Sequence, residues 1–263
     1  MTTRSYKSAT FPLAVMVCGI SISPAAELRP LSTDRPDTTE SPRTVDAGHF
    51  QFEMEIASST REGGAREFSL GELNAKIGLD HATDLQVVMP FYSHVRNGGE
   101  GFGDMEIRIK RNLWGNDEGA TALALMPFIK IPTANGDLGN GEFEGGLIVP
   151  LGFDGPTGWS CAVQAELAVE ADEDGSGYHL GLLNSVTGSH GLTENTAVFL
   201  ELVSVLSAES GADWEAYFNT GMTWAVTPTW AVTPTWQVDG GVRVGLTSAS
   251  ADFTPFVGLS TKF

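Results

Sequence analysis

The stretch DFTPFVGLSTKF, residues 252–263, alternates between two kinds of side chain along its whole length. One face would carry Pro255, Val257, Leu259, Thr261 and Phe263, and the other Thr254, Phe256, Gly258, Ser260 and Lys262. A C-terminal strand with a weakly apolar outer face and an aromatic last residue is typical of outer-membrane β-barrels. Only helices and closed barrels cross lipid, because every backbone N–H and C=O must be paired within the protein. The stretch therefore favours a barrel, provided that the rest of the chain agrees.

The N-terminal residues have the pattern of a signal peptide. Residues 1–10 contain Arg4 and Lys7 and no acidic residue, and residues 11–22 form a mostly apolar run that is shorter than a membrane span. Cleavage after Ala25 would leave small residues at both positions that the peptidase reads. We therefore expect residues 1–25 to be a signal peptide; the alternative is an apolar N-terminal strand.

The charge of the chain excludes one class of partner. Residues 1–25 contain two of the 15 basic residues and none of the 33 acidic ones, so their removal takes the formal net charge from −18 to −20. A surface this acidic does not attract phosphate, and nucleic acid is not an expected partner. Cys161 is then the sole cysteine, so the sequence predicts neither an intramolecular disulfide nor a cysteine metal cluster. We expect no cofactor.

Period-two alternation continues through most of the chain, and a 3.6-residue period is rare. The polar positions carry several charges per segment, which suits a wet lumen. We predict that the lumen is lined by Glu106, Arg108, Lys110, Glu166 and Arg243. A soluble sandwich gives the same alternation, so the period alone does not choose between the two classes.

The length and number of the alternating segments favour an up-and-down antiparallel transmembrane barrel. The segments run to roughly 10–13 residues, whereas strands of soluble proteins usually have about 5–6. An even number of strands places both ends of the barrel on the periplasmic side. We expect about twelve strands, with ten or fourteen as alternatives: 48–58, 66–79, 83–94, 103–113, 119–131, 141–152, 158–170, 176–190, 194–207, 212–226, 234–247 and 252–263.

The connections between these segments are of two kinds. Gly-rich, charged loops are expected at 61–66, 96–103, 134–141, 171–177 and 207–213, and they would face outward. Tight turns are expected at 80–83, 115–118, 154–157 and 191–194, and they would face the periplasm. The outward loops are short, so they do not form a surface domain.

Several short motifs are similar to one known family. TDRPDTTESP at 33–42, followed by GHFQFE at 48–53, resembles the entry segment of the outer-membrane transporters grouped as the "MetA-pathway of phenol degradation" family. GFGD at 101–104, Pro132-Thr133 and PFVGLS at 255–260 are also similar. The resemblance runs from about residue 32 to 263. It implies an outer-membrane barrel that passes small, often aromatic or hydrophobic molecules, and it implies no catalytic residue.

The chain departs from the family pattern at an exact repeat. TWAVTP at 223–228 occurs again at 229–234. A six-residue unit is too short to add a hairpin across a membrane. We interpret it as a duplication that lengthens a periplasmic turn, with an additional pair of strands as the alternative.

Residues 26–47 are predicted to be an irregular entry segment that precedes a barrel at 48–263. Prolines at positions 36 and 42 disfavour a helix or a central strand. Its charged side chains include Asp34, Arg35, Asp37 and Glu40. One interpretation is a disordered periplasmic leader. The other is a segment that enters the lumen and pairs with inward charges such as Lys76, Arg108, Lys110 and Arg243.

Other chemistry is sparse in the sequence. The acidic run at 170–175 lacks the spaced ligands and distal Glu of an EF-hand, so we interpret it as a solvated loop and predict no metal site. The five histidines are scattered, and no Ser–His pair is indicated by spacing, so we do not expect an enzyme.

These patterns lead to a passive transporter for small solutes, located in the outer membrane. The alternatives are a structural or plugged barrel without transport and a soluble periplasmic sandwich. Expected partners are outer-membrane lipid, the solute, and the barrel-assembly machinery, for which Phe263 would be the signal. An apolar solute that leaves sideways through the wall would need a gap, and the candidate places are Pro90, Pro127 and Pro150, which lie in otherwise apolar strands.

Overall fold

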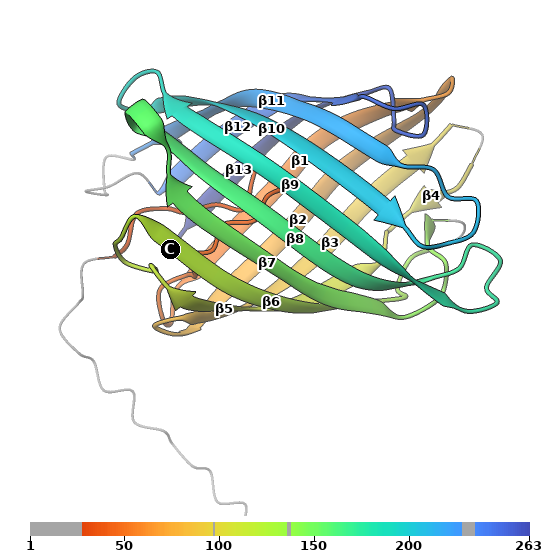
Figure 1. The fold of residues 1–263 in the computed structure, drawn as a ribbon, viewed down its shortest axis with the longest axis horizontal. Coiled ribbons are helices and arrows are strands. Elements are labelled where there is room, and N and C mark those ends of the chain that lie inside the picture. Colours follow the sequence, from red (N-terminus) through yellow and green to blue (C-terminus); the bar gives the residue numbers. More distant parts are fainter. Residues whose placement is uncertain (1–27, 97, 136–137, 228–234) are drawn as a thin grey trace, which may run out of the picture.

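The computed structural model describes residues 28–96, 98–135, 138–227 and 235–263. The predicted signal peptide lies outside this range. The described chain is a single barrel in which each long strand crosses from one end to the other (Figure 1). No described helix is long and apolar enough to cross a membrane.

Twelve long strands form the barrel within the described residues, as the sequence predicted. They are β1 (Phe50–Glu62), β2 (Ala65–Asp80), β3 (Thr83–Val95), β5 (Met105–Trp114), β6 (Thr121–Ile131), β7 (Glu144–Asp154), β8 (Trp159–Ala171), β9 (Tyr178–Gly191), β10 (Thr196–Ser207), β11 (Glu215–Val226), β12 (Trp236–Gly245) and β13 (Phe253–Lys262). A two-residue strand, β4 (Glu100–Gly101), and a 3-10 turn, η2 (Pro156–Gly158), complete the elements.

Antiparallel pairing between sequence neighbours joins the long strands, and the first strand pairs with the last. Phe52 of β1 lies opposite Thr261 of β13, and Glu53 lies opposite Ser260. This pairing leaves neither β1 nor β13 as a free edge. The fold is therefore the closed, up-and-down barrel that the length and number of the alternating segments favoured.

The barrel wall has apolar side chains on its outer face and polar side chains on its inner face, which is the reverse of a soluble protein. Large apolar side chains on the outside are exposed, among them Phe50, Phe52, Leu147, Leu167, Leu202 and Val257. Polar side chains on the inside are buried, among them Gln51, Glu53, Lys76, Lys110 and Glu201. An apolar outer band and a polar interior are what a barrel in lipid requires.

The ends of the barrel differ as their connections predicted. We call the end with the short turns 80–83, 114–121, 154–159 and 191–196 the terminus end, because β1 begins there and β13 ends there. We call the opposite end, with the Gly-rich and charged connections, the loop end. The 223–234 repeat begins in the last residues of β11, whose connection to β12 is at the terminus end. Residues 228–234 lie outside the described residues, so the interpretation of the repeat stays a prediction.

The prolines in the wall coincide with irregular pairing. β3 pairs with β5 as far as Val88 and Glu106, and then with β4 through Ser93 and His94. Between these two stretches one backbone bond is found, from Gly103 N–H to the Pro90 carbonyl at 3.2 Å. The ladders also skip residues near Pro127 on the β5 side and near Pro150 on the β6 side.

Candidate functional site

The described part of the entry segment, residues 28–47, lies inside the barrel and bonds to strands on several sides of the wall. In Figure 1 it is the red and orange coil that enters at the terminus end. Within it the backbone is neither helix nor strand, apart from a single bridge between Ala47 and Gly78 of β2. Its course is therefore fixed by bonds to residues of the wall.

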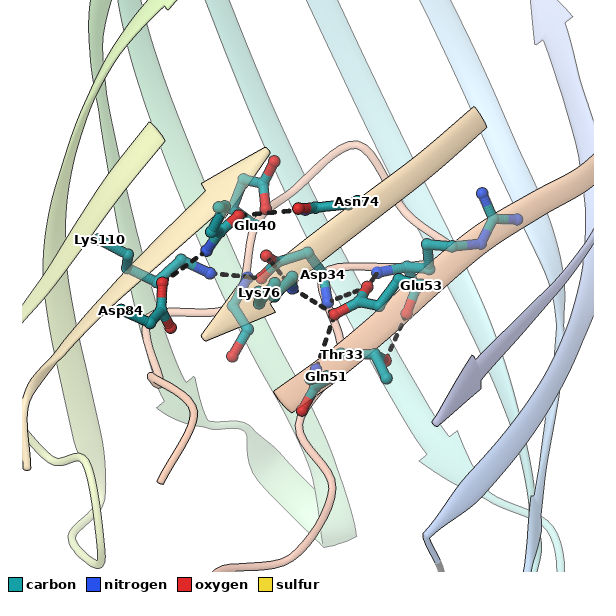
Figure 2. Close-up of polar contacts among 12 residues, drawn as sticks. Thr33, Asp34, Glu40, Gln51, Glu53, Asn74, Lys76, Asp84 and Lys110 are labelled. Carbon is teal, nitrogen blue, oxygen red and sulfur yellow. Dashed lines mark hydrogen bonds and ion pairs between the residues drawn. The ribbon is translucent and has the colours of Figure 1, made fainter. Parts of the chain in front are cut away.

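Asp34 is at the centre of a buried ion-pair cluster (Figure 2). Its carboxylate accepts hydrogen bonds from Lys110 Nζ, at 2.6 Å, and from Lys76 Nζ. Lys76 also contacts Glu53. All four side chains are buried, with at most 7% of Asp34 exposed. Charges taken out of water are expensive unless each is paired, so this arrangement favours one position of Asp34 in the lumen.

Wall side chains also accept hydrogen bonds from the backbone of the segment. Glu53 of β1 accepts the Asp34 and Arg35 N–H groups, at 2.9 and 3.0 Å. Glu201 of β10 accepts those of Thr38 and Thr39, at 2.9 and 2.7 Å. These bonds replace the ladder that an irregular segment lacks and satisfy donors that are otherwise buried without a partner.

Three more wall residues extend this pattern towards the terminus end. Gln164 of β8 accepts the Glu40 N–H at 2.7 Å. Asn116 accepts the N–H of Thr44 at 2.9 Å, and Asp84 of β3 accepts the N–H of Val45 at 3.0 Å. The segment is thus bonded to opposite parts of the wall, and its layout is specific rather than that of a loose leader.

Arginines connect the segment to the wall by a second set of ion pairs. Arg35 contacts Asp239 of β12 at 2.8 Å and Glu55 of β1 at 3.3 Å. Glu55 also contacts Arg243, at 2.8 Å, so it bridges the two arginines. Arg243 therefore meets the segment only through Glu55 in the described ion pairs.

The remaining residues of the predicted site also face the lumen. Arg108 contacts Glu40 of the segment at 2.5 Å and Glu106 on its own strand. Asp37 and Glu166 line the cavity beside Arg108. Neither forms an ion pair among the described residues.

The segment stands between two cavities. A cavity of about 340 Å³, the terminus-side cavity, is lined by the segment and by wall residues of β6 to β12 and the turn before β6. A cavity of about 260 Å³, the middle cavity, lies on its other side near Glu72, Arg108 and Arg243. The two cavities share four lining residues, all of them in the segment: Arg35, Pro36, Asp37 and Glu40.

A third space opens towards the loop end. This loop-side cavity, of about 520 Å³, is lined by Pro90, Gly103 and Asp104 at the irregular part of the wall. Glu72 also lines the middle cavity, so the two spaces adjoin. The lumen is therefore a succession of adjoining spaces, and the segment separates the terminus-side cavity from the middle cavity.

The segment is fixed again where it meets the last strand. Asp46 contacts Arg29 at 2.7 Å and the buried Lys262 of β13 at 3.0 Å. Burial works to raise the pKa of Asp46, but hydrogen bonds from Arg29 and Lys262 outweigh it and hold the pKa below its usual value. Next to this contact, Phe263 packs against the rings of Phe52 and Trp236.

Sequence reasoning did not single out the wall residues that receive the segment. Alternation places Glu53, Gln164, Glu201 and Asp239 on the polar face, but all polar-face residues look alike in such a pattern. The type of these residues could have identified them. Carboxylates and amides in the middle of strands, where solvent does not reach, need hydrogen-bond donors from the protein.

The sequence matches one family model over most of its length. The model of the family described as "Putative MetA-pathway of phenol degradation" matches residues 33–263. The chain belongs to this family. The resemblance in the entry segment and the closing strand is thereby confirmed. Among curated proteins, none matches the sequence.

Solved structures share the fold. The crystal structure of the COG4313 outer membrane channel from Pseudomonas putida F1 has a TM-score of 0.62 and 14% identity, over 88% of this chain and 100% of that one. The NanC porin has a TM-score of 0.58 and 9% identity, over 81% of this chain and 100% of that one. Together with the family, the closed barrel and its apolar outer band, these likenesses place the protein in the outer membrane.

Proposed function

We propose that this protein is a passive outer-membrane transporter for small solutes, closed at rest by residues 32–43 of the entry segment. The observation that carries the proposal is the position of the segment. It supplies every residue shared by the terminus-side and middle cavities. A solute that crosses the lumen must pass the segment, so moving it would open the route.

The chemistry of the lumen supports small solutes, including aromatic ones. The terminus-side cavity, at about 340 Å³, is at the lower end of the range of small-molecule sites, roughly 300–1,000 Å³. The buried ring of Phe199 lines it beside polar groups. The family description refers to phenol degradation, which fits a one-ring solute with a polar group.

Single-channel conductance with size-graded neutral solutes tests the proposal. Deletion of residues 32–43 should raise conductance and admit larger solutes, while the barrel still inserts. Because deletion removes the backbone donors that the segment supplies to Glu53 and Glu201, a second variant is needed that keeps the segment. An intact, inserted barrel whose conductance is unchanged by the deletion contradicts the proposed closure.

A reversible lock supplies the second variant. Thr39 Oγ1 and Ser185 Oγ are 2.7 Å apart, so cysteines at both positions, with Cys161 replaced by Ser, should form a disulfide between the segment and β9. The oxidised T39C/S185C protein should conduct no more than background, and reduction should restore solute flux. If neither form transports solute, the protein is the plugged structural barrel instead.

The irregular wall at Pro90 favours a second route for apolar solutes. There the β3–β5 ladder is reduced to the single Gly103–Pro90 bond, and the loop-side cavity lies directly behind it. We infer that an apolar solute leaves sideways at this place. A disulfide across it, in an F91C/F102C variant that forms the bond, should abolish uptake of an apolar solute and spare conductance of ions.

The exposed C-terminal side chain has a proposed role in assembly. Phe263 is 54% exposed, on the outer face of the terminus end. We infer that the barrel-assembly machinery reads it. Replacing Phe263 with Ala should slow membrane insertion in cells more than it lowers the stability of the refolded barrel.

A further inference from the structure

Four side chains from three parts of the chain meet at the loop end of the barrel. Glu170 is near the end of β8, Asp172 follows β8, His179 is near the start of β9, and Glu209 lies in the β10–β11 connection. We call these four residues the rim cluster. The sequence separates Glu209 from Asp172 by more than thirty positions, and only the pairing of β8, β9 and β10 brings them together.

The imidazole of His179 is surrounded by carboxylates. Its Nδ1 atom is 2.9 Å from Asp172 and 4.0 Å from Glu209, and its Nε2 atom is 3.3 Å from Glu170. The side chain is only 10% exposed. Three carboxylates around one imidazole leave an excess of negative charge that a cation would balance.

Three of these residues have the geometry of a metal site. Ligand atoms of Asp172, His179 and Glu209 all lie within 4.8 Å of one another. Zn²⁺ takes imidazole nitrogen and carboxylate oxygen at about 2.0–2.2 Å, so one ion fits between them after small side-chain adjustments. Glu170, on the other ring nitrogen, is placed as the carboxylate that commonly orients a metal-binding histidine.

The surrounding backbone holds these carboxylates in place and leaves room for them. A Cβ atom at Gly177 would lie 2.9 Å from Asp172 Oδ2, and one at Gly181 would lie 2.5 Å from Glu170 Oε1. The Glu173 N–H donates to Glu209 Oε1 at 2.9 Å, which leaves the other oxygen of Glu209 directed towards His179. The cluster is thus more ordered than a set of solvated acids.

We propose that Asp172, His179 and Glu209 form a Zn²⁺ site that links the β8–β9 and β10–β11 connections at the rim of the barrel. The donor set identifies the class of metal. Ca²⁺ and Mg²⁺ select oxygen ligands, whereas imidazole suits zinc and its neighbours among the transition metals. Three protein ligands leave one position of a tetrahedral ion for water. The site is independent of transport and lies apart from the segment.

Two other histidines provide matched controls. His94 is 3.1 Å from Glu100, and His81 is 3.1 Å from Asp117. Each has one carboxylate within reach among the described ion pairs and is half exposed or more. Neither has a second carboxylate nearby, as His179 has in the rim cluster, so neither should bind Zn²⁺ tightly.

Isothermal titration of the tag-free mature barrel with ZnCl₂, in detergent and with excess Mg²⁺, tests the proposal. The wild type and His94→Gln should bind one equivalent, and His179→Gln and Glu209→Gln should lose that site. Glu170→Gln should weaken it roughly tenfold to a hundredfold. No saturable binding by the wild type, or equal binding by Glu209→Gln, overturns the proposal.

Protease protection provides a readout in the same samples. Zn²⁺ should slow cleavage within residues 207–215 in the wild type and in His94→Gln, because the ion ties that connection to the next one. Residue 209 lies in a connection outside the strands, so the Glu209→Gln barrel should fold. This variant still tests the site if His179→Gln does not fold. Equal cleavage of the wild type with and without Zn²⁺ contradicts the link.

Discussion

The entry segment meets two unlike halves of the barrel wall. Towards β1, β2 and β5 it is held by buried charges, with Asp34 between Lys76 and Lys110. Towards β8, β9 and β10 it is held by hydrogen bonds from its backbone and hydroxyl groups to Gln164, Ser185 and Glu201.

The terminus-side cavity lies on the second of these halves. Its wall residues come from β6 to β12 and the adjoining turn. The difference indicates how the segment would move. In the proposed opening, the charged contacts would stay in place and the hydrogen-bonded contacts would release, next to the space through which a solute would pass.

Removing the central cation should have the largest effect. Lys76→Met leaves Asp34 with one cation and Glu53 with none, and breaking a buried ion pair costs about 3–5 kcal/mol. The free energy of unfolding should fall by that amount in guanidinium titrations followed by tryptophan fluorescence.

The control for this change is Lys130→Met, at the loop end. Lys130 also contacts two carboxylates, of Asp104 and Glu144, but it is 20% exposed. Its loss should cost no more than about 1 kcal/mol. Equal losses in the two variants would show that the Asp34 cluster does not anchor the segment.

Weakening the other half should affect opening more than stability. Glu201→Gln keeps the shape of the side chain but removes the charge that accepts from Thr38, Thr39 and Asn219. Hydrogen bonds to charged groups contribute about 1.5–3 kcal/mol, and we expect a loss within this range. Channel openings should become more frequent, whereas Glu194→Gln, in an exposed turn, should change neither quantity.

Two glycines test the contact between segment and wall by adding one methyl group. A Cβ atom at Gly78 would lie 2.1 Å from the Asp46 carbonyl oxygen, so the backbone of the segment must shift. Gly78→Ala should cost about 1–2 kcal/mol, as overpacking does, and raise conductance. At Gly258 the nearest atoms to an added Cβ belong to the Arg35 guanidinium, which is the end of a side chain rather than backbone, so Gly258→Ala should have a smaller effect in the same assays.

The smallest expected effect concerns pH at the terminus end. Because the folded pKa of Asp46 is lowered, its carboxylate stabilises the fold above its unfolded pKa of about 3.9, and the contribution is lost as pH falls through the folded value. Asp46→Asn should therefore be less stable than the wild type at pH 7, by no more than about 1 kcal/mol. The difference should disappear in acid; a difference that grows on acidification would contradict the assignment.

The two faces of each strand were predictable because alternation is a local property, and the length and number of the alternating segments then favoured a barrel. Glu106, Arg108 and Lys110 occupy every second position of one strand, and the period alone places them on one face. The contacts of Thr39 were not predictable, since its partners Ser185 and Glu201 are on distant strands and are fixed only by barrel closure.

The rim cluster was not predictable for the same reason, because its residues are brought together by strand pairing. The acidic run at 170–175 was interpreted as a solvated loop, because it lacks the internal spacing of a known cation loop. The residues that give Asp172 its surroundings are His179, near the start of β9, and Glu209, in the β10–β11 connection. Motif spacing along one stretch of sequence does not report ligands that strand pairing supplies.

The arrangement of the segment also sets an order of events during biogenesis. Residues 28–49 precede every strand, yet Glu201 belongs to β10, Asp239 to β12 and Lys262 to β13. The segment leaves the export channel first and finds its last partner only when the final strand is in place. If the segment closes the lumen as proposed, a barrel that stalls halfway lacks this closure, and the lumen becomes closed only when the last strand is in place.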